Sequence, residues 1–542
     1  MISEKKQHVR NSAFRILFAG IAVLLQLAWI FYMFLSLNDY YPYVNLVFSV
    51  LSIVVAFRVF LRDEISAFKL TWLILLLGFP ILGLCLYFLF GNKKLPRKIR
   101  RRLASFDEKT KDSLRQDPAV SARLAGRDPH IANVCRYTTV RGGYPLYENT
   151  RVTYYGDAAE GFEAQLADLA RAEKFIFMEY HAIEEASSFA RLQEVLVDRV
   201  QAGVEVRIFY DDVGSWTFID PGFIRRMQAL GISCRVFNPV RPFLNLFMNN
   251  RDHRKITVID GKVGFTGGYN LADEYFNLTH PYGVWKDSGI RLEGDAVKSL
   301  TAMFLELWNA MNDTDADLAP YLIPAASLLP ASGEGRVSAS SDAAADLDVE
   351  DSALTEGASV PEPSFVQPYA DRPMDGEPLS ENVYMNLIKT ATERLWITTP
   401  YLIISDEMQR ELILAAGRGV DVRIVTPGIP DKKIIYRVTR SYYGGLVRGG
   451  VKIYEYTPGF LHAKQMLRDD DTAIVGTINL DYRSLYHHFE DGVLLYDRPV
   501  AAAVAADFEK LFAVSEDVSE KYRGKRNRTI GQCILRWLAP LL

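Results

Sequence analysis

The chain has 542 residues, of which 49% are hydrophobic, and its formal net charge is −4 at pH 7. This length allows two or three domains, and the lack of a basic bias argues against a nucleic-acid-binding protein. The four cysteines form no Cys-x-x-Cys pair, so we expect neither a zinc site nor a disulfide framework.

The N-terminal part, residues 1–92, contains three apolar runs, at Ile16–Leu37, Val44–Leu61 and Leu70–Phe90. A helix of about 20 apolar residues can span a bilayer, so we predict a membrane region with transmembrane helices here. The second run is interrupted by Arg58 and the third by Pro80.

The next segment, residues 93–135, is predicted to be a basic juxtamembrane linker, because Lys and Arg are dense between Lys93 and Arg102. Such clusters mark the cytoplasmic flank of a membrane segment and attract anionic headgroups. The N-terminus is basic too, which favours placing both ends of this region on the same side of the membrane. Three complete spans would place them on opposite sides. Either one run is re-entrant, with Pro80 or Arg58 marking the candidate, or the N-terminal charge is overridden.

Two α/β halves are predicted, at residues 136–312 and 366–515, because short β-branched runs follow helical stretches that end at glycine. For example, Gly203–Ile208 in the first half has a counterpart in Gly419–Ile424 in the second. An internal repeat of this size indicates two copies of one design, which we expect to pack about a pseudo-twofold axis.

Each half contains the same pattern: His-x-Lys, four residues, Asp, six residues, Gly, two residues, Asn. Its candidate functional members are His253, Lys255, Asp260 and Asn270 in the first half and His462, Lys464, Asp469 and Asn479 in the second. One such His-x-Lys pair is usually a solvated strand edge, but the repetition favours catalysis. Two such faces suit a phosphodiester: one His attacks phosphorus, the other transfers a proton, and cations and amides hold the oxygens.

Carboxylates occur at matched positions after the two motifs, Asp287 in the first half and Glu490 in the second. An acid beside an imidazole can orient it and stabilise its charged form. We expect this role for both residues; the alternative is that they are ordinary carboxylates at strand ends.

Residues 313–365 are rich in Ala, Ser, Asp, Glu and Pro and lack periodic apolar positions, which predicts a disordered acidic linker between the halves. The C-terminal segment, residues 516–542, is basic and amphipathic and is typical of an interfacial helix. The apolar segment Phe243–Met248 could also face a membrane. Docking of either segment against the catalytic halves is an equally good interpretation.

The chain resembles the phospholipase D superfamily, whose motif is named after its His, Lys and Asp, and within it the bacterial cardiolipin synthases. The similar segments are NNRDHRKITVIDGKVGFTGGYNLADEY, TPYLIISDEM, IVTPGIPDKK, TRSYYGGLVRGGVKIYEYTPGFLHAK and VGTINLDYRSLYHHFE. The resemblance covers about residues 10–312 and 366–542. The acidic insertion and the third apolar run depart from the family's pattern, and the third run leaves the topology open.

This resemblance implies that two phosphatidylglycerol molecules give cardiolipin and glycerol through a phosphohistidine, without nucleotide, metal or other cofactor. It implies His253 as the nucleophile and His462 as the acid and base. The non-bridging oxygens would be held by Lys255, Lys464, Asn270 and Asn479. The motif residues Asp260 and Asp469 either belong to the catalytic set or serve a structural role.

The implied partners are phosphatidylglycerol, cardiolipin and membrane lipids, with no nucleic acid; the oligomeric state is not indicated. The implied location is the bacterial cell membrane, in a multi-pass protein with its catalytic halves in the cytoplasm. A phospholipase, or a phosphatidyltransferase with a different acceptor, could use the same motif residues and is the alternative.

Overall fold

The computed structural model describes residues 42–91, 96–239, 250–312, 318–322, 364–373, 376–524 and 530–541, together with positions 25, 28, 29 and 32. Most of the first apolar run, the segment Phe243–Met248 and nearly all of the acidic linker lie outside the described residues.

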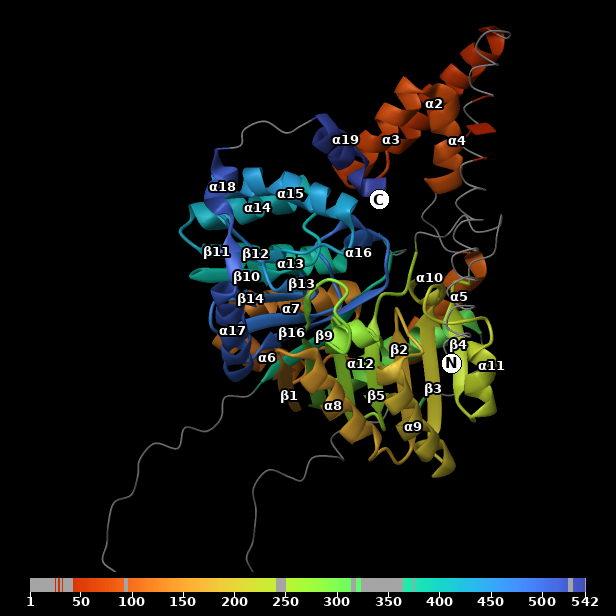
Figure 1. Cartoon of the computed structure of the whole chain (residues 1–542), viewed down its shortest axis with the longest axis vertical. Helices are drawn as coiled ribbons and strands as arrows, with labels where there is room; N and C mark the ends of the chain where they lie inside the picture. Colours follow the sequence, from red (N-terminus) through yellow and green to blue (C-terminus); the bar gives the residue numbers. More distant parts are fainter. Residues whose placement is uncertain are drawn as a thin grey trace, which may run out of the picture.

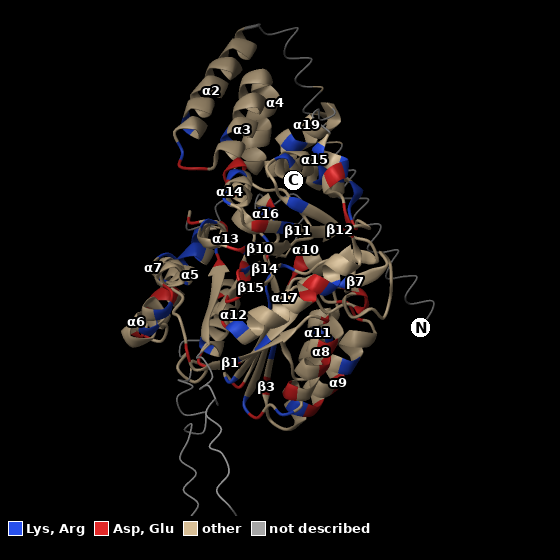
Figure 2. Ribbon diagram, turned by 90° about the vertical axis from the view of Figure 1, so that its left-hand side faces the viewer, with Lys and Arg blue, Asp and Glu red and all other residues tan. Residues whose placement is uncertain are grey.

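Three apolar helices precede the catalytic body: α2 (Pro42–Phe60), α3 (Ser66–Gly78) and α4 (Pro80–Phe90). They project together from one side of the molecule (Figure 1), and hardly any charged residue interrupts them (Figure 2). Among the described residues, α2 is the one helix long and apolar enough to cross a membrane, with a mean hydropathy of 2.0 over Tyr43–Phe60. The prediction of several transmembrane helices is therefore not confirmed.

The third apolar run is not one helix but a tight hairpin of α3 and α4. The chain turns at Phe79, and Pro80 starts α4, where the missing N–H costs nothing. The rings of Trp72 and Tyr87 then meet at 5.2 Å, and Gly83 lies against the backbone of Leu75, where no Cβ would fit. At 1.5 Å per residue the two helices are about 20 and 16 Å long, short of the roughly 30 Å hydrocarbon core.

Most of the segment expected to be a basic juxtamembrane linker is helical and packed. It forms α5 (Arg97–Thr110), α6 (Pro118–Arg127) and α7 (Pro129–Gly142). Asp128 begins α7 by accepting the N–H of His130 at 2.8 Å, and Pro129 follows at the first helical position. Leu103 and Leu124 of these helices are buried in the same core as residues of both halves.

The first half contains a seven-stranded sheet of order β1-β8-β6-β5-β2-β3-β4. Its strands are β1 (Thr150–Tyr155), β2 (Phe175–Tyr180), β3 (Glu205–Asp211), β4 (Ser233–Phe237), β5 (Lys255–Ile259), β6 (Val263–Gly267) and β8 (Gly289–Gly294). Its helices are α8 (Ala158–Leu169), α9 (Ser187–Gln201), α10 (Asp212–Ser215), α11 (Phe223–Ala229), η1 (Asp273–Phe276) and α12 (Val297–Met311). Strand β2 is buried along its whole length, as expected for a strand with packed layers on both faces.

The second half contains an eight-stranded sheet of order β17-β12-β11-β10-β14-β15-β16-β9. Its strands are β9 (Phe365–Asp371), β10 (Arg394–Thr398), β11 (Asp421–Pro427), β12 (Lys452–Tyr456), β14 (Gln465–Arg468), β15 (Thr472–Gly476), β16 (Glu490–Tyr496) and β17 (Ser515–Asp517). Its helices are α13 (Leu379–Thr390), α14 (Asp406–Gly417), α15 (Lys433–Arg448), α16 (Tyr482–Tyr486), α17 (Arg498–Ala513), α18 (Ser519–Arg523), α19 (Ile530–Leu538) and η3 (Ala539–Leu541).

The two sheets repeat one strand order, apart from the extra edge strand β17, so the predicted pair of α/β halves is confirmed. The halves are joined by a short parallel sheet of β7 (Val284–Lys286) and β13 (Gly459–Leu461) and by a bridge between Asp252 and Phe489. Each of these contacts stands directly beside a motif histidine.

The C-terminal helix α19 docks between the apolar hairpin and the second half (Figure 1). Thr71 Oγ1 of α3 donates to the carbonyl oxygen of Trp537 at 2.9 Å. The Arg536 guanidinium donates to Asp406 at 2.9 Å and lies 3.9 Å from the ring centroid of Tyr442. This helix therefore links the catalytic body to the apolar helices.

Candidate active site

The two motif histidines lie at the junction of the halves, each just before a central strand. His253 precedes β5, and His462 follows β13 and precedes β14. His253 N donates to the carbonyl oxygen of Phe489 at 2.9 Å, and His462 N donates to that of Lys286 at 2.7 Å. Both imidazole-bearing segments are thus held by backbone of the opposite half.

Each imidazole contacts a carboxylate from the other half. His253 Nδ1 lies 2.8 Å from Glu490 Oε2, and His462 Nδ1 lies 2.7 Å from Asp287 Oδ2. Both carboxylates are fully buried. Neither half therefore contains a complete His–acid pair on its own. The structure brings together the four residues that the sequence placed in separate motifs.

Burial and neighbouring charges set the ionisation of this group. Burial lowers the pKa of Lys255 to about 8 and that of Lys464 to about 7. Burial and the adjacent Lys464 lower the pKa of the His462 imidazole to about 3. Burial also keeps the pKa of the His253 imidazole well below its usual value. Burial raises the pKa of Asp287, but His462 and Lys464 outweigh it and hold that pKa below normal. A neutral imidazole that donates Nδ1–H to a carboxylate carries its lone pair on Nε2, so Nε2 is free to attack.

The motif lysines lie next to the motif histidines. Lys255 Nζ donates to the carbonyl oxygen of His253 at 2.6 Å. Lys464 Nζ donates to the carbonyl oxygen of His462 and lies 2.7 Å from its Nδ1. Two buried ammonium groups at one junction form a ready site for an anion.

The motif aspartates lie at the opposite ends of these strands from the imidazoles, roughly 20 Å away at 3.3 Å per residue. Asp260 accepts the backbone N–H groups of residues 173–175 at 2.7–3.0 Å, and Asp469 accepts those of residues 392–394 at 2.7–3.2 Å. Both adopt positive φ, 55° and 51°. They fasten the hairpin after each motif to the neighbouring strand and do not reach the site.

The motif asparagines are buried and held by local hydrogen bonds. Asn270 accepts from Ala182 N at 3.1 Å and donates to Tyr275 at 2.8 Å. Asn479 donates to Ser484 at 3.0 Å. The Tyr275 ring in turn lies 5.3 Å from the His462 ring, so Asn270 is one side chain away from an imidazole.

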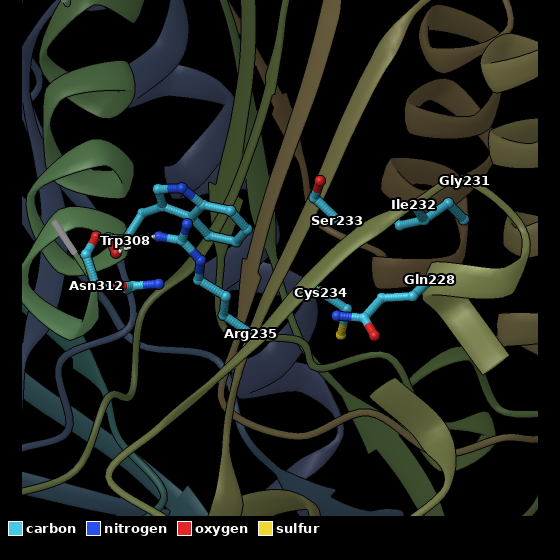
Figure 3. Close-up of a pocket in the computed structure, with 8 residues that line it drawn as sticks. All are labelled: Gln228, Gly231, Ile232, Ser233, Cys234, Arg235, Trp308 and Asn312. Atoms are coloured by element: carbon cyan, nitrogen blue, oxygen red, sulfur yellow. Dashed lines mark hydrogen bonds between the residues drawn. The ribbon is translucent and has the colours of Figure 1, made fainter. Parts of the chain in front are cut away.

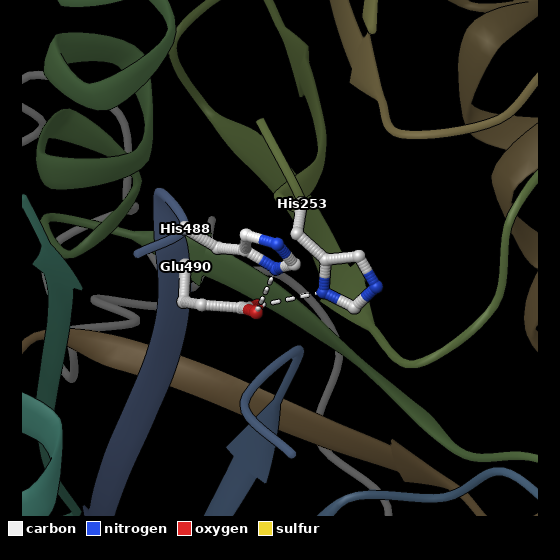
Figure 4. A group of neighbouring side chains, drawn as sticks. All are labelled: His253, His488 and Glu490. Atoms are coloured by element: carbon white, nitrogen blue, oxygen red, sulfur yellow. Dashed lines mark hydrogen bonds and ion pairs between the residues drawn. The ribbon is translucent and has the colours of Figure 1, made fainter. Parts of the chain in front are cut away.

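Two further histidines flank His253 and were missed by the sequence analysis. The rings of His181 and His488 lie 4.8 and 5.6 Å from the His253 ring. His488 Nδ1 lies 3.6 Å from Glu490 Oε1 (Figure 4). The position of His488, two residues before the matched carboxylate, is the signal that could have revealed it.

The surroundings of His462 are different. Its ring is enclosed by those of Tyr275, Trp285 and Phe460, at 5.3, 5.4 and 5.8 Å. Trp285 stands two residues before Asp287, where the other half has His488. The two chemically identical motifs therefore occupy unequal environments, one rich in imidazoles and one aromatic.

His253, His488 and Glu490 are close enough to act together as metal ligands (Figure 4). In the protein they already have other contacts: Thr477 Oγ1 donates to Glu490 at 2.5 Å, and Arg483 Nε donates to His488 Nε2 at 3.3 Å. The expectation that catalysis needs no metal stays a prediction.

Two cavities are lined by residues other than the two motif histidines. One, of about 460 Å³, is at the end of β4, where the Arg235 guanidinium lies 3.9 Å from the Trp308 ring centroid (Figure 3). The other, of about 280 Å³, opens between α3 and the second half and is lined by Phe68 and His488 among others. The His488 ring, which lines the second cavity, lies 5.6 Å from the His253 ring, so this cavity adjoins the candidate active site at the junction of the halves.

Comparisons with known proteins show which family the chain matches. The family model described as "Cardiolipin synthase, PLD-like domain" matches residues 166–308 and 384–512, and one described as "Phospholipase_D-nuclease N-terminal" matches residues 50–92. A cardiolipin synthase of Geobacillus kaustophilus is 31% identical over 90% of this chain and 92% of its own. An uncharacterized protein of Streptococcus mutans is 38% identical over 87% of this chain and 96% of its own.

A solved phosphatidylserine synthase of Haemophilus influenzae aligns with a TM-score of 0.53 at 14% identity, over 76% of this chain and 98% of that chain. At that identity the likeness concerns the fold alone. Both motif histidines fall within the matched family ranges, and the protein therefore belongs to the family of cardiolipin synthases with phospholipase D-like domains.

Proposed function

We propose that the protein is a cardiolipin synthase that transfers a phosphatidyl group from one phosphatidylglycerol to another, releasing glycerol. The observation that carries this proposal is the pair of crossed His–acid contacts, each next to a buried lysine. Two imidazoles in one anion site suit a two-step transfer at phosphorus.

In the first step, His253 Nε2 attacks the phosphorus of one lipid, the bond from phosphorus to the glycerol oxygen breaks, and His462 gives that oxygen a proton. In the second step, a headgroup hydroxyl of the other lipid gives its proton to His462 and attacks the phosphohistidine, which forms cardiolipin and frees His253. One phosphodiester is broken and one is made, so no nucleotide is consumed.

The acid role of His462 requires a proton that the free enzyme does not hold at neutral pH. The negative charge of a bound phosphodiester, added to that of Asp287, favours the protonated imidazole. The same phosphate favours the charged forms of Lys255 and Lys464, which would hold the non-bridging oxygens together with Asn270 and Asn479.

The membrane part is proposed to consist of two spans, the first apolar run and α2, followed by a re-entrant hairpin of α3 and α4. Support comes from the short helices of this hairpin and from its sharp turn at Pro80. Two spans return the basic N-terminus and the basic stretch 93–102 to one side, which we assign to the cytoplasm by the positive-inside rule. The catalytic halves would then be cytoplasmic.

The test of the reaction uses the purified full chain in vesicles with phosphatidylglycerol as the sole lipid substrate. We expect cardiolipin and free glycerol in equal amounts without nucleotide, and inhibition by added glycerol, because it drives the reverse reaction. A requirement for a cytidine-activated lipid would refute the proposal. Phosphatidic acid as the main product would favour the phospholipase alternative.

The test of topology uses a cysteine-free background in sealed, right-side-out spheroplasts. A membrane-impermeant thiol reagent should label Asn38→Cys, in the loop between the two spans, and should leave Phe79→Cys at the hairpin tip unlabelled. External labelling of Phe79→Cys would mean that α3 and α4 cross the membrane separately.

A further inference from the structure

The segment between β11 and α15, together with the start of α15, is an exposed strip of isoleucines and basic residues beside the candidate active site. Ile429 is 41% exposed and Ile434 is 59% exposed, and Lys432 and Lys433 between them are exposed as well. Arg437, one turn further along α15, also points outward. We name these five residues the lipid-contact strip.

This strip is fastened to catalytic elements at two points. Ile429 N donates to the carbonyl oxygen of Gly459, at the start of the strand β13 that leads into His462. Further along, Tyr401 donates a hydrogen bond to the Asp431 carboxylate at 2.5 Å, and Lys432 Nζ lies 5.3 Å from the Tyr401 ring centroid. The strip therefore holds a defined position at the edge of the site.

Three residues of the strip, Lys433, Ile434 and Arg437, belong to helix α15. Helix α15 runs across the face from which α2, α3 and α4 project, with α19 between them (Figures 1 and 2). Helix α19 exposes Ile530 and Ile534 there, at 81% and 48%. A hydrogen bond between Thr71 and Trp537 joins α19 to α3. The fold therefore fixes the distance between this face and the apolar helices.

The composition of the strip fits one kind of partner. Apolar side chains exposed close together and rimmed by charged residues mark surfaces that bind proteins or membranes. Lysines and arginines beside them attract anionic headgroups, while their stems stay apolar. A bilayer interface rich in phosphatidylglycerol offers both features at once.

We propose that the lipid-contact strip, Ile429, Lys432, Lys433, Ile434 and Arg437, rests on an anionic bilayer and delivers headgroups into the adjacent site. This inference rests on the proposed function, because the lipid it recognises is the substrate of that reaction. The strip then transfers substrate from the membrane plane, and the chemical step takes place at the junction of the halves.

The first experiment compares two forms of one substrate. Ile434→Asp and the double variant Lys432→Glu with Lys433→Glu should raise the KM for phosphatidylglycerol in vesicles by roughly tenfold or more. Their KM for monomeric dihexanoyl-phosphatidylglycerol, which has no bilayer, should change much less. The control is Val140→Asp on α7, a position that is 72% exposed and outside the strip. This variant should not change the KM for one substrate more than the KM for the other.

Equal KM increases for both substrates would overturn the inference, because the strip would then act on the site itself. A vesicle KM within twofold of wild type in both strip variants would overturn it too.

A second experiment does not depend on activity. A fluorophore on Ile434→Cys, in the cysteine-free background, should be quenched by nitroxide-bearing lipids in proteoliposomes, and one on Val140→Cys should not. Absence of quenching at position 434 would refute the lipid contact even if cardiolipin is made. Quenching in a protein that makes no cardiolipin would refute the proposed reaction instead.

Discussion

Replacing Glu490 by glutamine tests the crossed His–acid pairs most directly. Glu490 is fully buried and accepts from His253 Nδ1 at 2.8 Å and from Thr477 Oγ1 at 2.5 Å, both through Oε2. A glutamine oxygen can occupy that position and accept both hydrogen bonds. The substitution therefore removes the negative charge and preserves the shape and these two hydrogen bonds.

The expected size of the effect follows from the charge that develops on His253. When its Nε2 attacks phosphorus, the imidazole becomes positive about 4 Å from the carboxylate charge. At an effective dielectric constant of about 20, that interaction amounts to about 4 kcal/mol. Because each 1.36 kcal/mol corresponds to tenfold in rate, we expect turnover to fall by about a hundredfold to a thousandfold.

The assay is transfer from labelled phosphatidylglycerol in vesicles, with thermal unfolding measured on the same preparations. Asp287→Asn should cause a loss of similar order, because Asp287 holds His462 at 2.7 Å. Combining Glu490→Gln with His253→Ala should be no worse than His253→Ala alone, because the acid acts through that imidazole. A fall of less than tenfold in a folded Glu490→Gln protein would refute the reasoning and leave the carboxylate a structural role.

Three further predictions concern the motif histidines, the acidic linker and a buried lysine. His253→Ala and His462→Ala should each abolish cardiolipin formation. With a labelled substrate that carries a good leaving group, the His462→Ala protein should still trap labelled phosphate on its nucleophile; labelling of the His253→Ala protein instead would reverse the two roles. Deleting residues 331–364 should leave transfer activity largely intact, because the composition of this segment predicts a tether that contributes little to the core; a folded but inactive deletion would contradict this. Burial lowers the pKa of Lys464 from 10.5 to about 7, so the unfolded chain binds that proton more tightly, and stability in denaturant titrations should rise between pH 7 and 10.5. Lys464→Met should flatten that rise, and an unchanged slope would mean that Lys464 is not desolvated.

Local sequence determined much of this protein. The paired motifs indicate the two histidines and two lysines of the candidate site, because imidazole and ammonium groups suit transfer at phosphorus. The repeated strands predict two α/β halves because burial in such a sheet selects continuous β-branched runs. The apolar run that became α2 was recognisable from length and hydropathy alone.

Only the tertiary structure decided which acid serves which imidazole. Asp287 lies 175 positions from His462, and Glu490 lies 237 positions from His253. The pairing of β7 with β13 brings Asp287 to His462, and the bridge between Asp252 and Phe489 brings Glu490 close to His253. No spacing within one motif encodes either contact. The same holds for His488 beside His253 and for Trp285 beside His462, since matched positions in the two halves carry different residues.

Tertiary packing also decided the parts played by the motif aspartates and by Pro80. Asp260 and Asp469 share their motifs with the proposed catalytic residues. In each motif the extended strand places the aspartate at the far end from the histidine, where backbone N–H groups need an acceptor. Pro80 could equally have kinked a single span. It became a hairpin turn because Gly83 allows α4 to close directly onto α3, a contact between surfaces that a linear pattern does not specify.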